Sequence, residues 1–287
     1  MIAHVAEAGE GRGRVVLKLD ACTMASDCAI EAAVKVAQAF QSELEGLVVE
    51  DIALFDLASF PFAREISLSG RVRGALAAAD IEREAQLSAS ALLRKVEAIA
   101  ARAAVPLLRR TIRDDPVYAL ARACAANGPW NVVALAEPLN ALRAEMLERL
   151  FDTVAETTGV IVTGPRARRV TGPVIVAIEE IERLPPMLRA ARRLSAADGS
   201  EIRIVLTAED ERRLHWMDGQ ARLVMGDASG VQLETLAAAQ GPASLAERLR
   251  RMKASFVIAQ YGGLVAPRGD DLRPLSAALE CPLFLVR

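Results

Sequence analysis

The chain has 287 residues, 52% of them hydrophobic and 25% charged, which is enough material for two globular domains. Aromatic residues make up 4% and the formal net charge is −2, so we expect neither base-stacking surfaces nor the basic footprint of a nucleic-acid-binding protein. Residues 1–14 lack the apolar core of a secretion signal, and no uncharged apolar run reaches the ~20 residues of a membrane span. We therefore expect a cytoplasmic protein that binds neither membranes nor nucleic acid.

The first part of the chain alternates short apolar runs with amphipathic stretches. Runs rich in β-branched residues predict buried strands at residues 15–19, 47–49, 106–112, 132–135 and 160–162. Ser26 and Asp27 can cap a helix after the first strand, and Asp115-Pro116 marks another helix start. One amphipathic helix is expected within a long insertion, residues 51–104, and another over residues 142–154. This alternation predicts a parallel, doubly wound sheet.

The same order of elements starts again at residue 174. Strands are predicted at residues 174–178, 202–206, 231–236, 256–259 and 283–286. Ser244 and Glu247 have the spacing of a capping box, which predicts a helix start between the third and fourth of these strands. The offset between matching strands falls from 159 residues at the first to 124 at the fourth, so the second copy is 35 residues shorter. Repetition on this scale indicates a duplicated domain.

The repeat divides the chain into four parts. We predict an N-terminal tail (1–13), a first domain (14–165), a linker (166–173) and a shorter second domain (174–287). Gly-Pro pairs bound the linker, and it carries three arginines that we interpret as solvated chain rather than as a phosphate-binding patch.

Three segments resemble the universal stress protein family. They are VVLKLD at residues 15–20, RDDPVYALARACAANGPWNVVALAE at 113–137 and AALECPLFLVR at 277–287. The resemblance implies two Rossmann-like, adenine nucleotide alpha hydrolase-like α/β domains, each a mostly parallel five-stranded sheet with helices on both faces. Members of the family pair through their fifth strands. Here residues 159–163 and 283–286 could pair within one chain as a pseudo-dimer, and a homodimer stays open as well.

The nucleotide motif of that family is degenerate here. ATP-binding members carry G-x2-G-x9-G-[ST] after the fourth strand, because glycine lets backbone N–H groups approach phosphates closely. The matching G-x2-G stretch reads Ala136-Glu137-Pro138-Leu139 in the first copy and Gln260-Tyr261-Gly262-Gly263 in the second. Arg273-Pro274 stands where Gly-[ST] is expected, and Arg268 and Arg273 could offset phosphate charge. One glycine of the second copy, Gly263, matches the motif, and the Gly262-Gly263 pair fits a nucleotide clamp or a plain turn.

Acidic residues end the first strand of each copy. The resemblance places Asp20, and Glu179 in the second copy, near an adenosine, although a cap on the next helix is equally open for both. The resemblance also places the backbone of Val49 at the adenine. The candidate cofactor-binding residues are Asp20, Val49, Glu179, Gly262, Gly263 and Arg273. We expect no bound cofactor, with ATP or AMP as the alternative.

The sequence contains few residues in an arrangement that indicates catalysis. The two histidines, His4 and His215, lie outside any recognisable triad, and there is no Walker A stretch, no G-x-S-x-G elbow and no H-E-x-x-H motif. We predict neither catalytic residues nor a metal site. Cys22 and Cys28 flank the first helix start, where the pKa of a thiol can be lowered, so a redox role stands beside plain packing.

Three functional hypotheses follow. The first is a non-enzymatic stress-response or signalling protein that binds little or no ATP and works through dimerisation or a protein partner, with the apolar residues 54–62 as a contact surface. The second is an ATP or AMP sensor that binds mainly in the second copy. The third is a nucleotide hydrolase of the same superfold, since a fold does not fix a function.

Overall fold

The computed structural model describes residues 13–21, 23, 25–66, 72–75, 78–126, 130–139, 141–226, 230–237 and 242–287. Its first half contains, in chain order, β1 (Arg14–Asp20), α1 (Asp27–Ala39), β2 (Glu43–Asp51), α2 (Ile52–Ser59), β3 (Arg64–Ile66), β4 (Val72–Ala75), α3 (Ala78–Arg102), β5 (Leu107–Asp114), α4 (Pro116–Ala125), β6 (Asn131–Leu135), α5 (Ala141–Thr153) and β7 (Thr157–Val162). Its second half contains β8 (Val174–Ile178), the short 3-10 helix η1 (Ile181–Arg183), α6 (Leu184–Ala196), β9 (Ile202–Ala208), α7 (Glu211–Met225), β10 (Val231–Ala237), α8 (Pro242–Arg251), β11 (Phe256–Gln260), a second 3-10 helix η3 (Gly269–Leu272), α9 (Arg273–Ala278) and β12 (Leu283–Val286).

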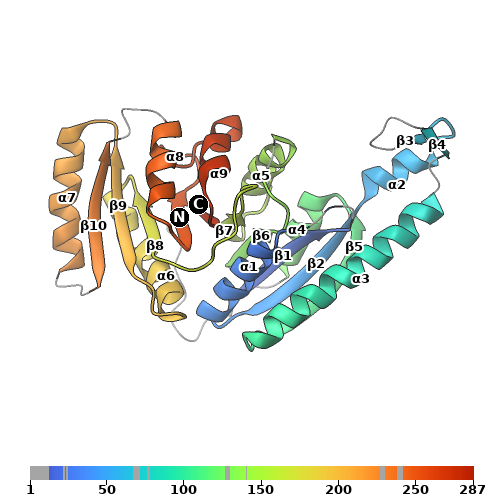
Figure 1. Cartoon of the computed structure of the whole chain (residues 1–287), viewed down its shortest axis with the longest axis horizontal. Helices are drawn as coiled ribbons and strands as arrows, with labels where there is room; N and C mark the ends of the chain where they lie inside the picture. Colours follow the sequence, from blue (N-terminus) through green and yellow to red (C-terminus); the bar gives the residue numbers. More distant parts are fainter. Residues whose placement is uncertain are drawn as a thin grey trace.

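One 10-stranded sheet runs through the whole molecule, in the order β10-β9-β8-β11-β12-β7-β6-β1-β2-β5 (Figure 1). Strands within each half are parallel. The halves meet where β12 pairs with β7 in antiparallel register, with Leu283 opposite Val162 and Val286 opposite Gly159. The expected pairing of the fifth strands within one chain is therefore present. Because this junction is antiparallel, all strands of one half point opposite to those of the other.

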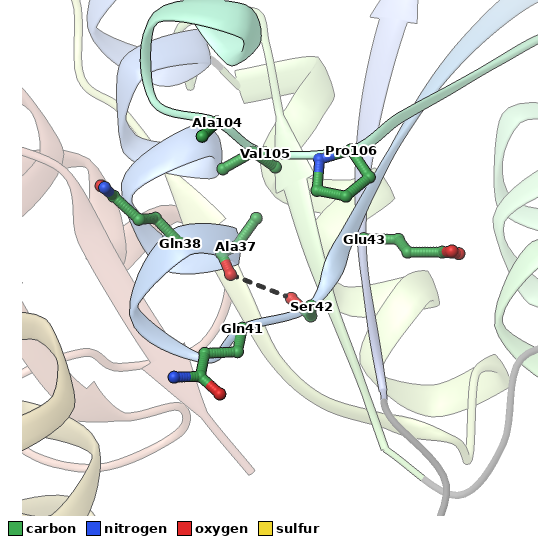
Figure 2. Close-up of a pocket in the computed structure, with 8 residues that line it drawn as sticks. All are labelled: Ala37, Gln38, Gln41, Ser42, Glu43, Ala104, Val105 and Pro106. Carbon is green, nitrogen blue, oxygen red and sulfur yellow. Dashed lines mark hydrogen bonds between the residues drawn. The ribbon is translucent and has the colours of Figure 1, made fainter.

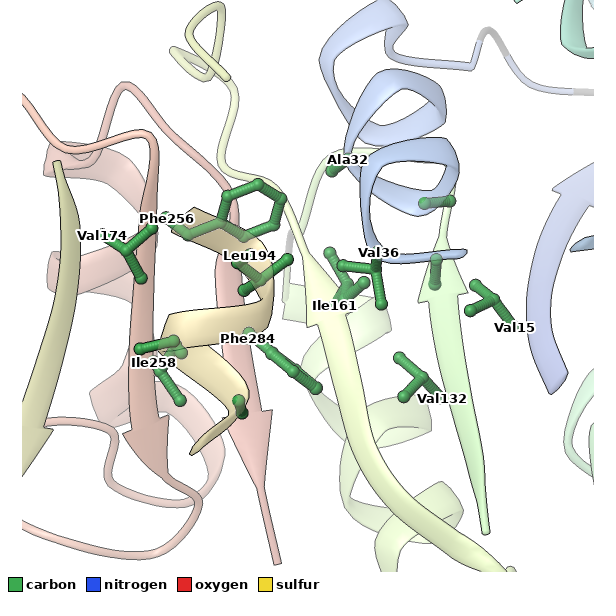
Figure 3. Packing of buried hydrophobic residues seen from close by; sticks show 14 of the residues in the cluster. Val15, Ala32, Val36, Val132, Ile161, Val174, Leu194, Phe256, Ile258 and Phe284 are labelled. Carbon is green, nitrogen blue, oxygen red and sulfur yellow. The ribbon is translucent and has the colours of Figure 1, made fainter. Parts of the chain in front are cut away.

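Helices cover both faces of the sheet, as expected for alternating β and α elements. The side chains of β1 alternate between the faces: Val15, Leu17 and Leu19 belong to one buried cluster and Val16 to the other. The first cluster includes residues of α1, α3, α6 and α7, and the second includes residues of α4, α5, α8 and α9. Each cluster contains residues of both halves, so each core is continuous across the junction. Figure 3 shows residues of the first cluster from both halves.

A glycine makes the close packing at the junction possible. A Cβ atom on Gly159 would lie 2.5 Å from the ring of Phe284 and 2.8 Å from the carbonyl oxygen of Leu285. The C-terminal Arg287 then ties the strand end to α5, because its guanidinium donates to the carbonyl oxygen of Val154 at 2.9 Å. Backbone pairing, ring packing and this tie together hold the two half-sheets against each other.

Several boundaries differ from the sequence-based expectations. The second strand extends over Glu43–Asp51, well beyond residues 47–49. The insertion contains α2 and the β3–β4 hairpin in addition to the expected long helix. Ser26 occupies the N-cap position of α1 without a side-chain hydrogen bond, and α8 begins at Pro242, before the expected capping box. In contrast, the Asp115 side chain accepts N–H groups of Val117 and Tyr118 and caps α4, as predicted.

Candidate functional site

The loop that follows β11 closes around an acidic side chain of the same half. β8 and β11 are parallel neighbours, so Glu179 and the loop after Gln260 meet at the carboxyl edge of this half-sheet. The N–H of Leu264 donates to Glu179 Oε2 at 2.6 Å, and the N–H of Val265 donates to Glu179 Oε1 at 2.8 Å. Both carboxylate oxygens are thus held by consecutive backbone donors, an arrangement that suits an anion.

The two glycines of the degenerate motif shape this loop. Gly262 has φ +84°, a left-handed conformation that glycine adopts without strain, and its N–H donates to the carbonyl oxygen of Ala266 at 2.8 Å. At Gly263, a Cβ atom would lie 2.3 Å from Glu179 Oε2 and 2.6 Å from Oε1. The carboxylate of Glu179 therefore fills the space that a side chain at position 263 would occupy.

The environment of Glu179 sets its protonation. Burial raises the pKa of Glu179, and the two backbone N–H groups lower it, with the net result that the pKa lies above the ordinary 4.5. The side chain does not cap a helix: η1 has Glu180 at its N-cap position. The helix-cap interpretation of Glu179 is wrong, since both of its oxygens face the β11 loop.

Residues of the first half cover the outer side of this loop. The ring of Tyr261 stacks on Phe151 of α5 with centroids 4.2 Å apart. Arg268 lies over the Tyr261 ring and forms an ion pair with Asp152 at 3.6 Å. Burial raises the pKa of Tyr261 above its ordinary value. The positive charge of Arg268 thus faces Asp152 of the first half. Arg273 is exposed and occupies the first position of α9.

The equivalent place in the first half is filled by a buried ion pair. Lys18 Nζ lies 3.4 Å from Glu137 Oε2 and 3.9 Å from Asp20 Oδ2, and the side chains of Lys18 and Glu137 are both buried. The N–H of Leu139 donates to the carbonyl oxygen of Thr163 at 2.7 Å. In this loop Ala136 and Leu139 stand where the nucleotide motif has glycines, the N–H of Leu139 is already bonded, and a carboxylate and a proline lie between the two positions.

The structure brings together most of the residues proposed from the sequence, in two separate groups. Glu179, Gly262 and Gly263 form the closed loop of the second half. Asp20 and Val49 are register partners in β1 and β2, and the Val49 side chain is buried. Sequence reasoning missed Lys18 because a single lysine in an apolar run gives no sign of its partner; the acidic Glu137 in the matching loop was the available signal.

Other chemistry finds little support in the described part of the chain. No group of His, Cys, Asp and Glu there has the arrangement of a metal site. Burial and nearby Glu31 raise the pKa of Cys28 to about 12, so the expectation of a lowered thiol pKa is wrong for Cys28. Cys22, like His4, lies outside the described residues.

A surface pocket lies at the amino ends of β2 and β5, on the edge of the first half-sheet opposite to the loop that holds Glu137 (Figure 2). Its lining consists of Ala37, Gln38, Gln41, Ser42, Glu43, Ala104, Val105 and Pro106. The Ser42 hydroxyl donates to the carbonyl oxygen of Ala37 at 3.4 Å, and Glu43 forms an ion pair with Arg14 at 2.8 Å. These polar groups are engaged by the chain itself and converge on no common point.

In both loops, groups that could meet a phosphate already interact with a carboxylate of the chain. In the second half the donors that would receive a phosphate already hold Glu179, and a second anion would meet that carboxylate. In the first half Ala136 and Leu139 replace the glycines, Glu137 and Pro138 lie between them, and the charge of Lys18 is already opposed by Glu137.

Comparison with known proteins bears on the fold. No protein-family profile and no curated protein sequence matches the chain. Among solved structures, a universal stress protein from Archaeoglobus fulgidus superposes with a TM-score of 0.58 at 15% identity, over 95% of this chain and 96% of that chain. A candidate universal stress protein from Pseudomonas aeruginosa gives 0.59 at 14% identity, over 96% and 93%.

The chain has the universal stress protein fold. Both of these similar structures match nearly the whole chain, so the likeness extends over the two half-sheets together. The chain is also similar to the cytoplasmic domain of a prokaryotic cation chloride cotransporter, with a TM-score of 0.56 at 12% identity over 96% of this chain and 95% of that one. In the described residues of our chain, no helix has the length and apolar content to cross a bilayer.

Proposed function

We propose that this chain is a non-enzymatic, universal stress protein-like factor of the cytoplasm that works through protein contacts and not through bound ATP. The observation that carries the proposal is the carboxylate of Glu179, which accepts the N–H groups of Leu264 and Val265. It takes the two donors that a phosphate would need and adds a negative charge at the same point. The loop of the first half is altered in a second way, by Glu137 and Pro138.

The likeness to the cotransporter domain adds a consideration about partners. That neighbour is one domain of a larger protein, and its fold spans nearly the whole of our chain. We propose that this chain, too, works as a unit attached to or contacting other protein parts. A role through contacts would need no nucleophile and no general base.

Nucleotide sensing is the second candidate, favoured by the geometry of the β11 loop itself. Consecutive N–H groups and a left-handed Gly262 form an anion-binding turn, and only the side chain of Glu179 occupies it. If Glu179 swung out, two donors would face a ligand. The two candidates thus differ in one testable property, whether a nucleotide can displace this carboxylate.

Isothermal titration calorimetry separates them. The wild-type chain and the Glu179→Ala and Gly263→Val variants are titrated with ATP and AMP to millimolar concentration. The proposal expects no saturable heat for the wild type. Saturable wild-type binding that disappears in Gly263→Val would reject it in favour of the sensor. Mass spectrometry of small molecules released from the denatured protein, expected to find no adenine nucleotide, gives an independent check.

A further inference from the structure

The segment from α2 to β3 presents large apolar side chains to solvent. None of the side chains of α2 is buried. The exposed apolar residues are Ile52 (44%), Leu57 (48%), Phe60 (48%), Phe62 (72%) and Ile66 (64%). These five residues are called the α2 surface below. They lie at the end of the molecule beyond β5, away from the junction between the halves (Figure 1).

The α2 surface is held in place although its outer side is uncovered. Asp51 caps α2 by accepting the N–H of Ala53 at 2.9 Å. Arg113 of β5 lies 3.8 Å from the centre of the Phe55 ring and forms ion pairs at 2.9 Å with both Glu50 and Glu82. The helix is therefore clamped to β2, β5 and α3 through one arginine. Such preorganisation lowers the ordering cost of an interaction with a partner.

The β3–β4 hairpin beside α2 is incomplete as an isolated element. It forms a two-stranded sheet that is separate from the 10-stranded sheet. A two-stranded hairpin alone is at best marginally stable in water, and further strands or packing are needed to support it. The segment thus has both an uncovered apolar side and strand edges that a partner could complete.

The structure also restricts how two copies of the chain could pair. β7 lies between β6 and β12, and β12 lies between β11 and β7, so neither fifth strand has a free edge. The pairing of fifth strands that the family resemblance implies is made inside this chain. A dimer of the chain must therefore use another surface.

If all five side chains enter the contact, their exposed area is of the size that a stable dimer needs. With about 200 Å² for a fully exposed large apolar side chain, the five residues present roughly 550 Å² of apolar surface. Interfaces are about 60% apolar, so this corresponds to roughly 900 Å² in each copy. Stable interfaces bury about 800 Å² per partner.

Charges beside the α2 surface favour a copy of the same chain. Asp56 of α2 and Arg64 of β3 are both exposed, and neither forms an ion pair with another described residue. A two-fold axis makes each interaction occur twice, so Asp56 of one copy can meet Arg64 of the other in both directions. A partner with a basic or an acidic surface would leave one of the two charges opposed by a like charge.

We infer that the chain forms a homodimer through the α2 surface, with the Asp56 and Arg64 pairs at its rim. This rests on the proposed function, because it names the partner through which the protein would act. In this dimer the two α2 surfaces would form the contact, and the 10-stranded sheet of each copy would extend away from it. The β7–β12 junction of each copy would lie far from the contact.

The test is sedimentation equilibrium of the full chain over a range of concentrations. The wild type is expected at twice the 30.7 kDa chain mass. Phe62→Asp is expected to weaken the dimer at least a hundredfold, because a two-fold dimer would bury one new carboxylate from each copy. Leu223→Asp is the matched control: Leu223 is 77% exposed on α7, at the other end of the sheet, and its substitution should leave the mass unchanged.

Charge reversal tests the pairing itself. Asp56→Arg and Arg64→Asp should each weaken the dimer, and the double variant should restore it. A wild type that stays at 30.7 kDa, a Phe62→Asp variant that stays dimeric, or a double variant that stays monomeric would each overturn the inference. None of these outcomes bears on the absence of nucleotide binding, which calorimetry tests separately.

Discussion

The contact between Gly263 and Glu179 gives the sharpest test of the closed loop. A methyl group at position 263 would lie 2.3 Å from Glu179 Oε2, so Gly263→Ala must push the carboxylate out of the loop. Gly263 does not have a positive φ, so alanine introduces no backbone strain of its own. The loss is that of two hydrogen bonds to a charged acceptor, partly offset by hydration of the released carboxylate. We expect the free energy of unfolding to fall by about 2–3 kcal/mol.

A double-mutant cycle followed by urea unfolding tests the cause. Glu179→Ala should cost a similar amount, and adding Gly263→Ala to it should cost little more, since the contact is already gone. Gly262→Ala is the control: its φ of +84° predicts a cost of about 1–2 kcal/mol that does not depend on Glu179. Additive losses from Gly263→Ala and Glu179→Ala would refute the reasoning.

Three further predictions concern protonation and capping. Because the folded-state pKa of Glu179 lies above 4.5, the stability of the wild type should fall as pH rises from 4.5 through that pKa; Glu179→Ala should remove this component from the pH dependence of urea unfolding. Asp115→Ala should lose about 1 kcal/mol near pH 7. Although burial pulls the pKa of Asp115 upward, two backbone N–H groups and Arg149 hold it below 3.8, so this difference should be lost as pH falls through the folded pKa, as thermal unfolding at low pH can measure. Cys28 and Cys281, whose thiol pKa burial raises to about 12, should stay unalkylated by iodoacetamide at pH 8 in the folded protein, as judged by mass spectrometry.

Much of the sheet could be predicted because its central strands are buried on both faces. The runs at residues 132–135 and 174–178 are continuous and apolar, which is what a parallel strand covered by helices on both sides requires. β2 was predicted too short because it begins with Glu43, Leu44 and Glu45. Glu45 is buried there with Arg14 at 2.9 Å and Arg110 at 3.7 Å as ion-pair partners, and both arginines are distant in the sequence.

The position of the candidate site could be predicted from the sequence, but the occupation of the β11 loop by the Glu179 side chain could not. Parallel strands bring Glu179 and Gly263 to one edge of the sheet, and this follows from the repeat alone. Whether the acid caps a helix or enters the loop depends on a few ångströms of backbone position, which no local pattern encodes. The same holds for Lys18, whose burial depends on Glu137 more than a hundred residues later.

The antiparallel junction between β7 and β12 determines which way each half faces. The carboxyl ends of the first five strands lie along one long edge of the sheet, and those of the second five lie along the other. The loops that hold Glu137 and Glu179 therefore open in opposite directions. A molecule bound to one loop cannot reach the other, so any communication between them would have to pass through the strands, as a change in the shared sheet itself.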